Sequence, residues 1–255
     1  MIDRKAIIEK LEEKLEPLSY IYALWLEGAD ALGTVDQYSD MDIWVDFEDQ
    51  YEQQAIEIVE NVLQSLAPFD LNEELAHSHP KIRQKVYHLS GTDKYLMIDF
   101  CWQFHSRNES ERTLIKGCMI EPAKMIFDKT GAIKFKPFLI SEFTEGNDAI
   151  LKDSLFRYSQ HDRVLKYVYR SNYLEAYAYY NRYILEPLIN LLRLIYTPSH
   201  ADYYLIHISR HIPEQERKRL EYFAKISSFE DITEKIKPAE IWISELLDRV
   251  NALRI

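Results

Sequence analysis

The chain has 255 residues, of which 47% are hydrophobic and 29% are charged, a balance typical of one large or two small folded domains and not of a disordered chain. It has no apolar run of the about 18 residues that a membrane-spanning helix needs. Its N-terminus lacks the apolar core of a signal peptide, so we expect a cytoplasmic protein without a membrane partner. Cys101 and Cys118 lack metal-ligand spacing and are expected to stay reduced.

The net charge of −11 is unevenly distributed. Residues 1–149 carry 15 Lys and Arg against 28 Asp and Glu, whereas residues 150–255 carry 16 against 14. An acidic first half disfavours a nucleic-acid groove, which needs a basic surface. It suits a small cationic ligand, because a cleft of one sign concentrates ligands of the other, although the acidity could serve solubility alone.

Hydrophobic periodicity predicts alternating helices and strands in the first half. Apolar residues at helical spacing predict helices over 3–16 and 49–66, ended by Pro17 and Pro68. The β-rich runs predict strands, with a glycine loop after the first and turns between later pairs. The expected strands cover 20–26, 43–47, 69–76 (a strand or an extended connection), 85–89 and 95–102, with a short hairpin over 127–133.

Residues 136–147 carry Pro and Gly without periodicity and form the best candidate for a domain boundary. From Asp148 onward the pattern is helical. Pro213 followed by acidic residues predicts a helix start, and residues 229–253 predict the last helix. The second half is therefore expected to be an antiparallel helix bundle.

Asp40 and Asp42 lie two residues apart at the head of an apolar run, so in a strand their side chains point to the same face. Two carboxylates this close repel each other unless a cation lies between them, and Mg²⁺ is the natural choice. A polar hairpin with solvent-facing aspartates is the alternative. Asp99 lies inside the apolar run 95–102, where a charge is costly unless it is paired or metal-bound. We interpret it as a third ligand, with a structural salt bridge as the alternative.

Two further patterns are weaker. His77 and His79 form a His-x-His pair, but no third ligand is evident, and a polar turn before Pro80 is the better interpretation. Seven tyrosines lie between residues 167 and 183. They could line an acceptor pocket, but their helical spacing favours core packing.

Taken together, Gly28-Ala29, Ser39-Asp40-Met41-Asp42 with ten residues between Ala29 and Asp40, and Asp99 in a later strand resemble the polymerase-beta-type nucleotidyltransferase superfamily. In that family Gly-Ser precedes Asp-x-Asp by about ten residues, and a third carboxylate follows on a strand. Length and the helical second half look most like the aminoglycoside and lincosamide nucleotidyltransferases. The resemblance implies an α+β fold, with a small mixed sheet and flanking helices over 1–140 as the catalytic domain and a helical substrate-binding domain over 141–255.

The resemblance also implies a chemistry. Gly28, Ala29, Ser39 and Asp40 would contact a nucleotide, and two Mg²⁺ ions would bridge the triphosphate to the three aspartates Asp40, Asp42 and Asp99. A nucleoside monophosphate, AMP from ATP, would pass to a hydroxyl of a small acceptor that could be cationic, such as an aminoglycoside-like or lincosamide-like antibiotic. Transfer to a protein hydroxyl, and a degenerate nucleotide-binding module without activity, are the alternatives. A homodimer would be in keeping with similar enzymes.

One departure from the family pattern is Ala29, where the family has Ser. The backbone donor is kept and one hydroxyl is lost, at a cost of about 1.5–3 kcal/mol for a hydrogen bond to a charged group. The general base is open between Asp153 on a predicted helix, Glu186 beside Pro187, and Asp99 itself. Arg157 and Lys166 are candidate phosphate contacts, with a solvated helix face as the better interpretation.

Overall fold

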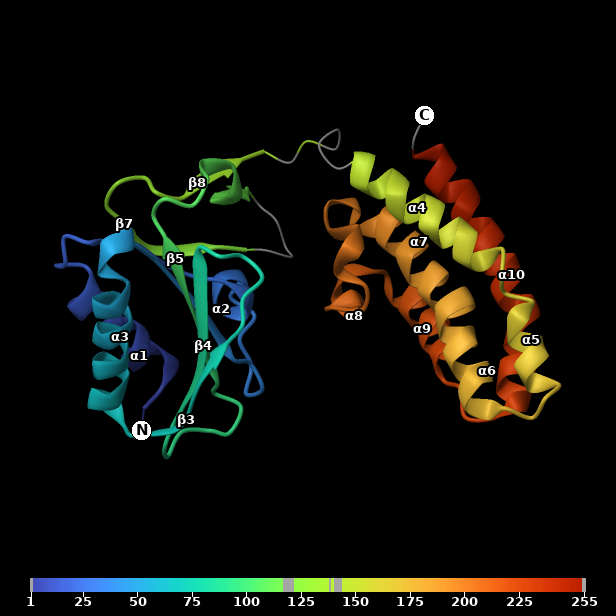
Figure 1. The fold of residues 1–255 in the computed structure, drawn as a ribbon, viewed down its shortest axis with the longest axis horizontal. Coiled ribbons are helices and arrows are strands. Elements are labelled where there is room, and N and C mark those ends of the chain that lie inside the picture. Colours follow the sequence, from blue (N-terminus) through green and yellow to red (C-terminus); the bar gives the residue numbers. More distant parts are fainter. Residues whose placement is uncertain (1, 117–121, 138, 140–143, 254–255) are drawn as a thin grey trace. The chain divides into compact units, whose positions relative to one another are not determined.

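A computed structural model describes residues 2–116, 122–137, 139 and 144–253, so Cys118 lies outside the described residues. The chain divides into two compact units, Met1–Phe138 and Leu139–Ile255 (Figure 1). The first unit contains the strands and the second contains only helices among its described residues. The fold is therefore α+β, as expected from the sequence.

A six-stranded mixed sheet forms the first unit, in the order β3-β4-β5-β2-β1-β7. The central β2 and β5 run parallel to each other, and the other neighbours are antiparallel. The strands are β1 (Ile21–Leu26), β2 (Met41–Phe47), β3 (Phe69–Leu75), β4 (Ile82–Leu89), β5 (Ile98–Phe104) and β7 (Lys124–Asp128).

Helices α1 (Arg4–Leu15) and α3 (Glu52–Leu66) pack on one face of this sheet (Figure 1). The Asp3 side chain caps α1 by accepting a hydrogen bond from the Ala6 N–H at 2.9 Å. Apolar residues at helical spacing on both helices meet every second residue of β2 and β5, which produces the core of the unit. The central members are Ile7, Leu11, Leu15, Val59, Leu63, Met41, Ile43, Val45, Phe100 and Trp102.

The opposite face of β2 carries Asp42, Trp44 and Asp46, which alternate with the core residues. A smaller apolar cluster lies on this face, around the stacked pair Trp25 and Trp44, whose ring centroids are 5.7 Å apart. Two short parallel strands, β6 (Thr113–Ile115) and β8 (Lys134–Lys136), pair with each other in a separate sheet.

The prediction of a short hairpin over residues 127–133 is wrong. β7 pairs with β1, and β8 pairs with β6. The reason is that β1 supplies the partner strand of β7, while the Asp128 carboxylate closes a turn by accepting hydrogen bonds from the backbone N–H groups of Ala132 and Ile133 at 2.9 and 3.1 Å. This turn directs the chain away from β7 instead of folding it back alongside.

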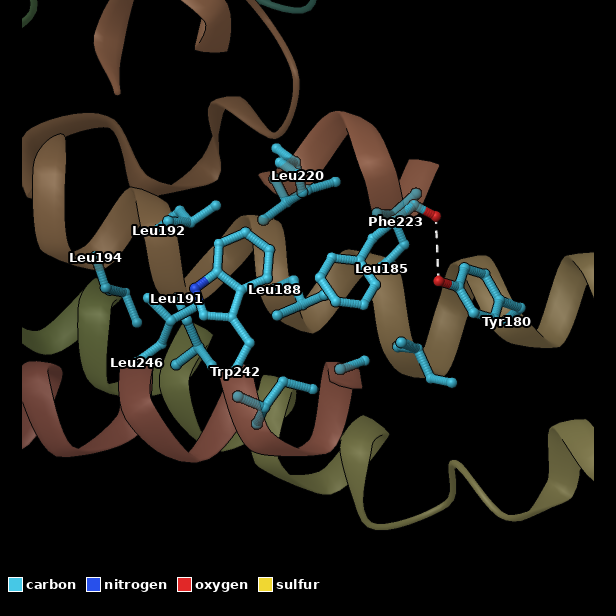
Figure 2. Packing of buried hydrophobic residues seen from close by; sticks show 14 of the residues in the cluster. Tyr180, Leu185, Leu188, Leu191, Leu192, Leu194, Leu220, Phe223, Trp242 and Leu246 are labelled. Carbon is cyan, nitrogen blue, oxygen red and sulfur yellow. Dashed lines mark hydrogen bonds between the residues drawn. The ribbon is translucent and has the colours of Figure 1, made fainter. Parts of the chain in front are cut away.

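The second unit is a bundle of helices around one apolar core (Figure 2). Phe223 stacks on Trp242 with a centroid distance of 5.3 Å, and the buried Tyr180 donates its hydroxyl to the Phe223 carbonyl at 3.1 Å. Leucines of α7 pack in the same apolar core as Phe223, Trp242 and Tyr180. The helices are α4 (Thr144–Tyr158), α5 (Arg163–Val168), α6 (Tyr173–Tyr180), α7 (Glu186–Tyr196), α8 (Ile208–His211), α9 (Glu214–Ala224) and α10 (Phe229–Ala252).

One turn of π-helix, Asn181–Leu185, leads into α7. Further along α7, the fully buried Arg193 donates to the carbonyl of Tyr204 at 2.8 Å and contacts His211 Nδ1 at 2.9 Å. Arg193 therefore anchors the loop after α7 through neutral acceptors. None of the helices in the described part of the chain is long and apolar enough to cross a membrane.

Candidate functional site

The parallel pairing of β2 and β5 brings two predicted site residues together. Asp42 is the register partner of Asp99, and Asp46 is the partner of Gln103. Partners in a ladder point their side chains to the same face, so Asp42 and Asp99 lie side by side on the face opposite α1 and α3. Asp40 precedes the first residue of β2 and is exposed.

The carboxylates at this end of the sheet influence one another electrostatically. Burial raises the pKa of Asp42 to about 6, and the negative charges of Asp40 and Asp99 add to the effect. Burial also raises the pKa of Asp99, although Gln84 opposes this by donating its amide Nε2 to both carboxylate oxygens at 2.8 Å. Asp99 is therefore satisfied by an amide and not by the salt bridge that the sequence left as the alternative.

The backbone at the end of β1 is closely fitted to Asp42. Gly28 has a φ of +57°, and a Cβ added to it would lie 2.1 Å from Asp42 Oδ2. The neighbouring Glu27 N–H donates to the Asp42 carbonyl at 2.9 Å. Glycine suits this position, because any other residue would adopt a strained backbone conformation and would displace the Asp42 carboxylate.

The expected glycine loop begins with a short helix, α2 (Gly28–Leu32), which ends at Gly33 in the left-handed conformation. Ala29 lies in the first turn of α2 and is half-buried. Ser39 lies in the loop that leads to β2. Its hydroxyl donates to Asp36 Oδ1 and accepts from the Asp36 N–H, both at 3.0 Å, so the hydroxyl holds the loop.

Sequence reasoning missed Arg4, which joins these segments. Its guanidinium donates to Asp30 Oδ2 at 2.6 Å, to the Asp40 carbonyl at 2.7 Å and to the Ser39 carbonyl. Asp30 is a fourth carboxylate at the site, and burial raises its pKa against the opposing effect of Arg4. No sequence signal predicts these contacts, because Arg4 lies 26 and 36 residues from Asp30 and Asp40.

A Mg²⁺ site was expected at Asp40, Asp42 and Asp99. Within the described ranges, no three Asp, Glu, His or Cys side chains are arranged closely enough to hold a metal ion. The donor chemistry itself suits Mg²⁺, because the carboxylate oxygens of these aspartates are hard ligands, and burial together with the charges of Asp40 and Asp99 raises the pKa of Asp42. To bind an ion together with Asp42, the Asp99 carboxylate would have to turn from the amide of Gln84.

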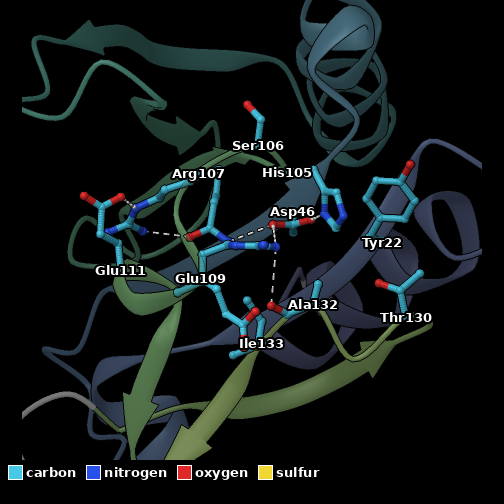
Figure 3. Close-up of polar contacts among 12 residues, drawn as sticks. Tyr22, Asp46, His105, Ser106, Arg107, Glu109, Glu111, Thr130, Ala132 and Ile133 are labelled. Atoms are coloured by element: carbon cyan, nitrogen blue, oxygen red, sulfur yellow. Dashed lines mark hydrogen bonds and ion pairs between the residues drawn. The ribbon is translucent and has the colours of Figure 1, made fainter.

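Further along the same face lies a fully buried carboxylate, Asp46 (Figure 3). It accepts from Gln103 Nε2 at 2.7 Å and pairs with His105 Nδ1 at 2.6 Å, and Arg112 lies 3.9 Å away. Arg107 donates to the Gln103 side-chain oxygen at 2.7 Å and extends this network. The network satisfies Asp46 from three sides, so its role is to hold the strand ends together.

The two helical base candidates lie in the second unit and share one arginine. Arg157 contacts Asp153 Oδ2 at 2.5 Å and Glu186 Oε2 at 3.1 Å. Asp153 is about half exposed on α4, and Glu186 directly follows the π-helical turn. Arg157 is therefore engaged by two carboxylates, and Lys166 lies over the ring of Tyr167 at 5.5 Å.

No family model and no curated protein matches the chain. Among solved structures, it is similar to a spectinomycin adenyltransferase from Enterococcus faecialis solved with ATP and spectinomycin, at 12% identity and a TM-score of 0.35, over 98% of this chain and 100% of that one. It is also similar to a nucleotidyltransferase-like protein from Exiguobacterium sibiricum, at 10% identity and a TM-score of 0.33, over 96% of this chain and 75% of that one. At this sequence identity and TM-score, the function has to be judged from the residues of the site.

Proposed function

We propose that the chain is a Mg²⁺-dependent nucleotidyltransferase, which moves a nucleoside monophosphate, AMP from ATP, onto a hydroxyl of a small acceptor. The observation that carries the proposal is the register of Asp42 opposite Asp99, with Asp40 one residue before β2. Burial and mutual repulsion at this position make the carboxylates costly without a cation, so a structural role alone explains them poorly.

The roles of the residues follow from their chemistry. Asp40, Asp42 and Asp99 would hold Mg²⁺ and, through it, the triphosphate. When bound there, Mg²⁺ supplies positive charge that stabilises both the attacking and the leaving oxygens of an in-line displacement. Gly28 lets the backbone approach Asp42 closely, and Arg4 fixes the loop that carries Asp40.

In the proposed reaction, the acceptor oxygen forms a bond to the α-phosphorus of the nucleotide. The bond from that phosphorus to the oxygen bridging to the β-phosphate breaks, and pyrophosphate leaves with the electron pair. The acceptor proton needs a base. Of the three candidates we favour Asp99, because it lies opposite Asp42 at the proposed nucleotide site, and its carboxylate would turn from the amide of Gln84 to take the proton. Asp153 and Glu186 are less suited, because both are engaged by Arg157.

The acceptor would be small and cationic, as in antibiotic-modifying enzymes, with residues 141–255 as the domain that binds it. The excess of acidic residues in 1–149 supports a cationic acceptor, because a negatively charged surface raises the local concentration of cations. Transfer to a protein hydroxyl remains the alternative within the same reaction class.

A second candidate is a nucleotide-binding module without transferase activity. Two observations favour it. Ala29 has no hydroxyl to offer a phosphate, and the hydroxyl of Ser39 is engaged by Asp36. Such a protein would bind Mg·ATP through the aspartates but would release no pyrophosphate.

Isothermal titration with Mg·ATP, and with Mg·GTP for comparison, tests the site directly. We expect binding to the wild type and loss of binding in an Asp40→Asn/Asp42→Asn variant, while an Asp162→Asn variant on the exposed surface of the second unit serves as control. Unchanged binding in the double variant would refute the site. Pyrophosphate release from radiolabelled ATP across an antibiotic panel, with mass spectrometry for AMP adducts on proteins, then distinguishes the two acceptor classes and the inactive module.

A further inference from the structure

Two exposed tyrosines meet at the end of the sheet that carries the aspartates. Tyr38 is 62% exposed and Tyr95 is 41% exposed. Their rings pack edge to face, with centroids 5.1 Å apart and planes at 78°. Single exposed aromatics are ordinary, but here two partly exposed rings from two different loops contact each other next to a polar site.

The two loops enter the two strands that hold the site. Residues 36–40 lead into β2 and residues 93–97 lead into β5. The Met41 N–H donates to the Met97 carbonyl at 2.8 Å, which fixes one loop against the other. Tyr38 is therefore two residues from Asp40, and Tyr95 is four residues from Asp99, at one end of the sheet.

Local hydrogen bonds order both loops. The Tyr38 N–H donates to Asp36 Oδ1 at 2.9 Å, and the Tyr95 N–H donates to Asp93 Oδ1 at 3.0 Å. Each loop is an Asx turn that presents its tyrosine outward. A ring held by an ordered backbone loses little conformational entropy when a ligand stacks on it, which makes the pair suitable for binding a flat ligand.

Charges of both signs lie beside the pair, because Asp36 and Asp93 belong to the two turns and Lys94 follows Asp93. Lys94 lies over the Tyr95 ring, with its Nζ 4.8 Å from the centroid. Lys94 would attract the phosphates of a nucleotide whose base contacts the rings, while the carboxylates of Asp36 and Asp93 are engaged by the backbone N–H groups of Tyr38 and Tyr95. Every nucleobase has a π-face that can stack on an aromatic side chain.

From this arrangement we propose that Tyr38 and Tyr95 form a platform for the nucleobase of the bound nucleotide, which stacks on one ring and meets the other, nearly perpendicular ring along its edge, while the triphosphate reaches the aspartates. The inference rests on the proposed function, since it says where the nucleobase of the proposed nucleotide substrate binds. Stacking reads the ring face and not the hydrogen-bonding edge, so the platform accepts ATP and GTP with little discrimination.

The test compares two ligands that differ by the nucleoside. Binding of Mg·ATP and of Mg·tripolyphosphate is measured by calorimetry for the wild type and for Tyr38→Ala, Tyr95→Ala, Tyr38→Phe and Tyr95→Phe. We expect the Ala variants to weaken Mg·ATP binding by about 5- to 150-fold, the range of base–aromatic stacking, and to leave tripolyphosphate binding unchanged. The Phe variants keep the ring and should bind Mg·ATP like the wild type. Tyr169→Ala, at a residue 79% exposed in the second unit, is the matched control.

The other outcomes separate the inference from the proposed function. If Mg·ATP binds through Asp42 but the Ala variants bind it normally, the platform is refuted and the proposed function stands. Equal weakening of both ligands, or weakening by the Phe variants as well, also refutes the platform, because the effect would then not come from the base or the ring. If the wild type binds neither ligand, both proposals fall. Thermal unfolding curves confirm that each variant is folded before it is compared.

Discussion

Asp42 and Asp99 are register partners across the two parallel strands at the centre of the sheet. The 56 residues between them contain a helix and two antiparallel strands, so only the fold brings them together. Two carboxylates on one face of adjacent strands repel each other, and burial adds to the cost of their charges. This arrangement makes the position sensitive to protons and to cations, and several measurable consequences follow from it.

Removing either carboxylate should abolish Mg²⁺-dependent nucleotide binding. Removing a residue that only hydrogen-bonds to a metal ligand lowers metal affinity about 10- to 100-fold. Asp42→Asn or Asp99→Asn, which would remove a ligand itself, should lower the affinity for Mg·ATP by at least as much. Calorimetry with Mg·ATP measures the effect. Asp162→Asn, on a side chain that is 89% exposed, should bind like the wild type. Wild-type affinity in both site variants would show that the aspartates bind no metal.

The raised pKa of Asp42 predicts the pH dependence of stability without metal. The folded state has a pKa of about 6 against an ordinary value of 3.8, so it binds this proton more tightly than the unfolded state. The contribution of Asp42 to stability is therefore fully present below the unfolded pKa and is lost as the pH rises through 6. Asp42→Asn should remove this dependence, which thermal unfolding between pH 4 and 8 would reveal as the difference between the two proteins.

Magnesium should offset the loss of stability that ionised Asp42 causes at high pH. At pH 7.5, where Asp42 is ionised, Mg²⁺ should raise the unfolding temperature of the wild type. Below pH 6 the proton competes with the ion, and the stabilisation should disappear. A monovalent salt at equal ionic strength is the control that separates specific ion binding from electrostatic screening. Equal stabilisation by a monovalent salt would contradict a specific divalent site.

Much of this fold was predictable from periodicity, and the site only in part. Asp40 and Asp42 are two residues apart, and Asp99 is a charge in an apolar run, so local sequence indicates all three. The amide of Gln84 on Asp99 and the guanidinium of Arg4 on the Asp40 loop were not predictable. Both depend on strand register or helix docking, which no local pattern encodes. The hairpin expected after residue 127 was wrong for a similar reason, because β1 supplies the partner strand.

Gly28→Ala should destabilise the protein and disturb Asp42, because the added Cβ would lie 2.1 Å from Asp42 Oδ2. The left-handed φ alone costs a non-glycine residue about 1–2 kcal/mol. Gly33→Ala is the matched control, since Gly33 also has a positive φ of +69° but nothing lies within 4 Å of its added Cβ. Both variants should lose stability in urea unfolding, and only Gly28→Ala should also lose Mg·ATP binding. Normal binding in Gly28→Ala would show that the fit to Asp42 is not required.

Arg4→Met should leave the half-buried Asp30 without its cationic partner and free the loop that carries Asp40. Removing one member of such a pair costs about 1–3 kcal/mol, because the other group remains desolvated. The double variant Arg4→Met/Asp30→Asn should recover part of the loss, which a double-mutant cycle in urea unfolding measures. Additive losses in the cycle would indicate that the two side chains do not interact.

Ala29→Ser distinguishes an active transferase from a binding module. The substitution places a hydroxyl in the first turn of α2, where the family resembled by the sequence has a serine. One hydrogen bond to a charged group contributes about 1.5–3 kcal/mol, so the variant should bind Mg·ATP about 10- to 150-fold more tightly if the hydroxyl reaches a phosphate. Ala29→Val, which adds bulk without a donor, is the control for packing. Pyrophosphate release by the wild type would establish it as active with Ala29, whereas release by Ala29→Ser alone would identify the natural protein as a nucleotide-binding module that has lost transfer through this one hydroxyl.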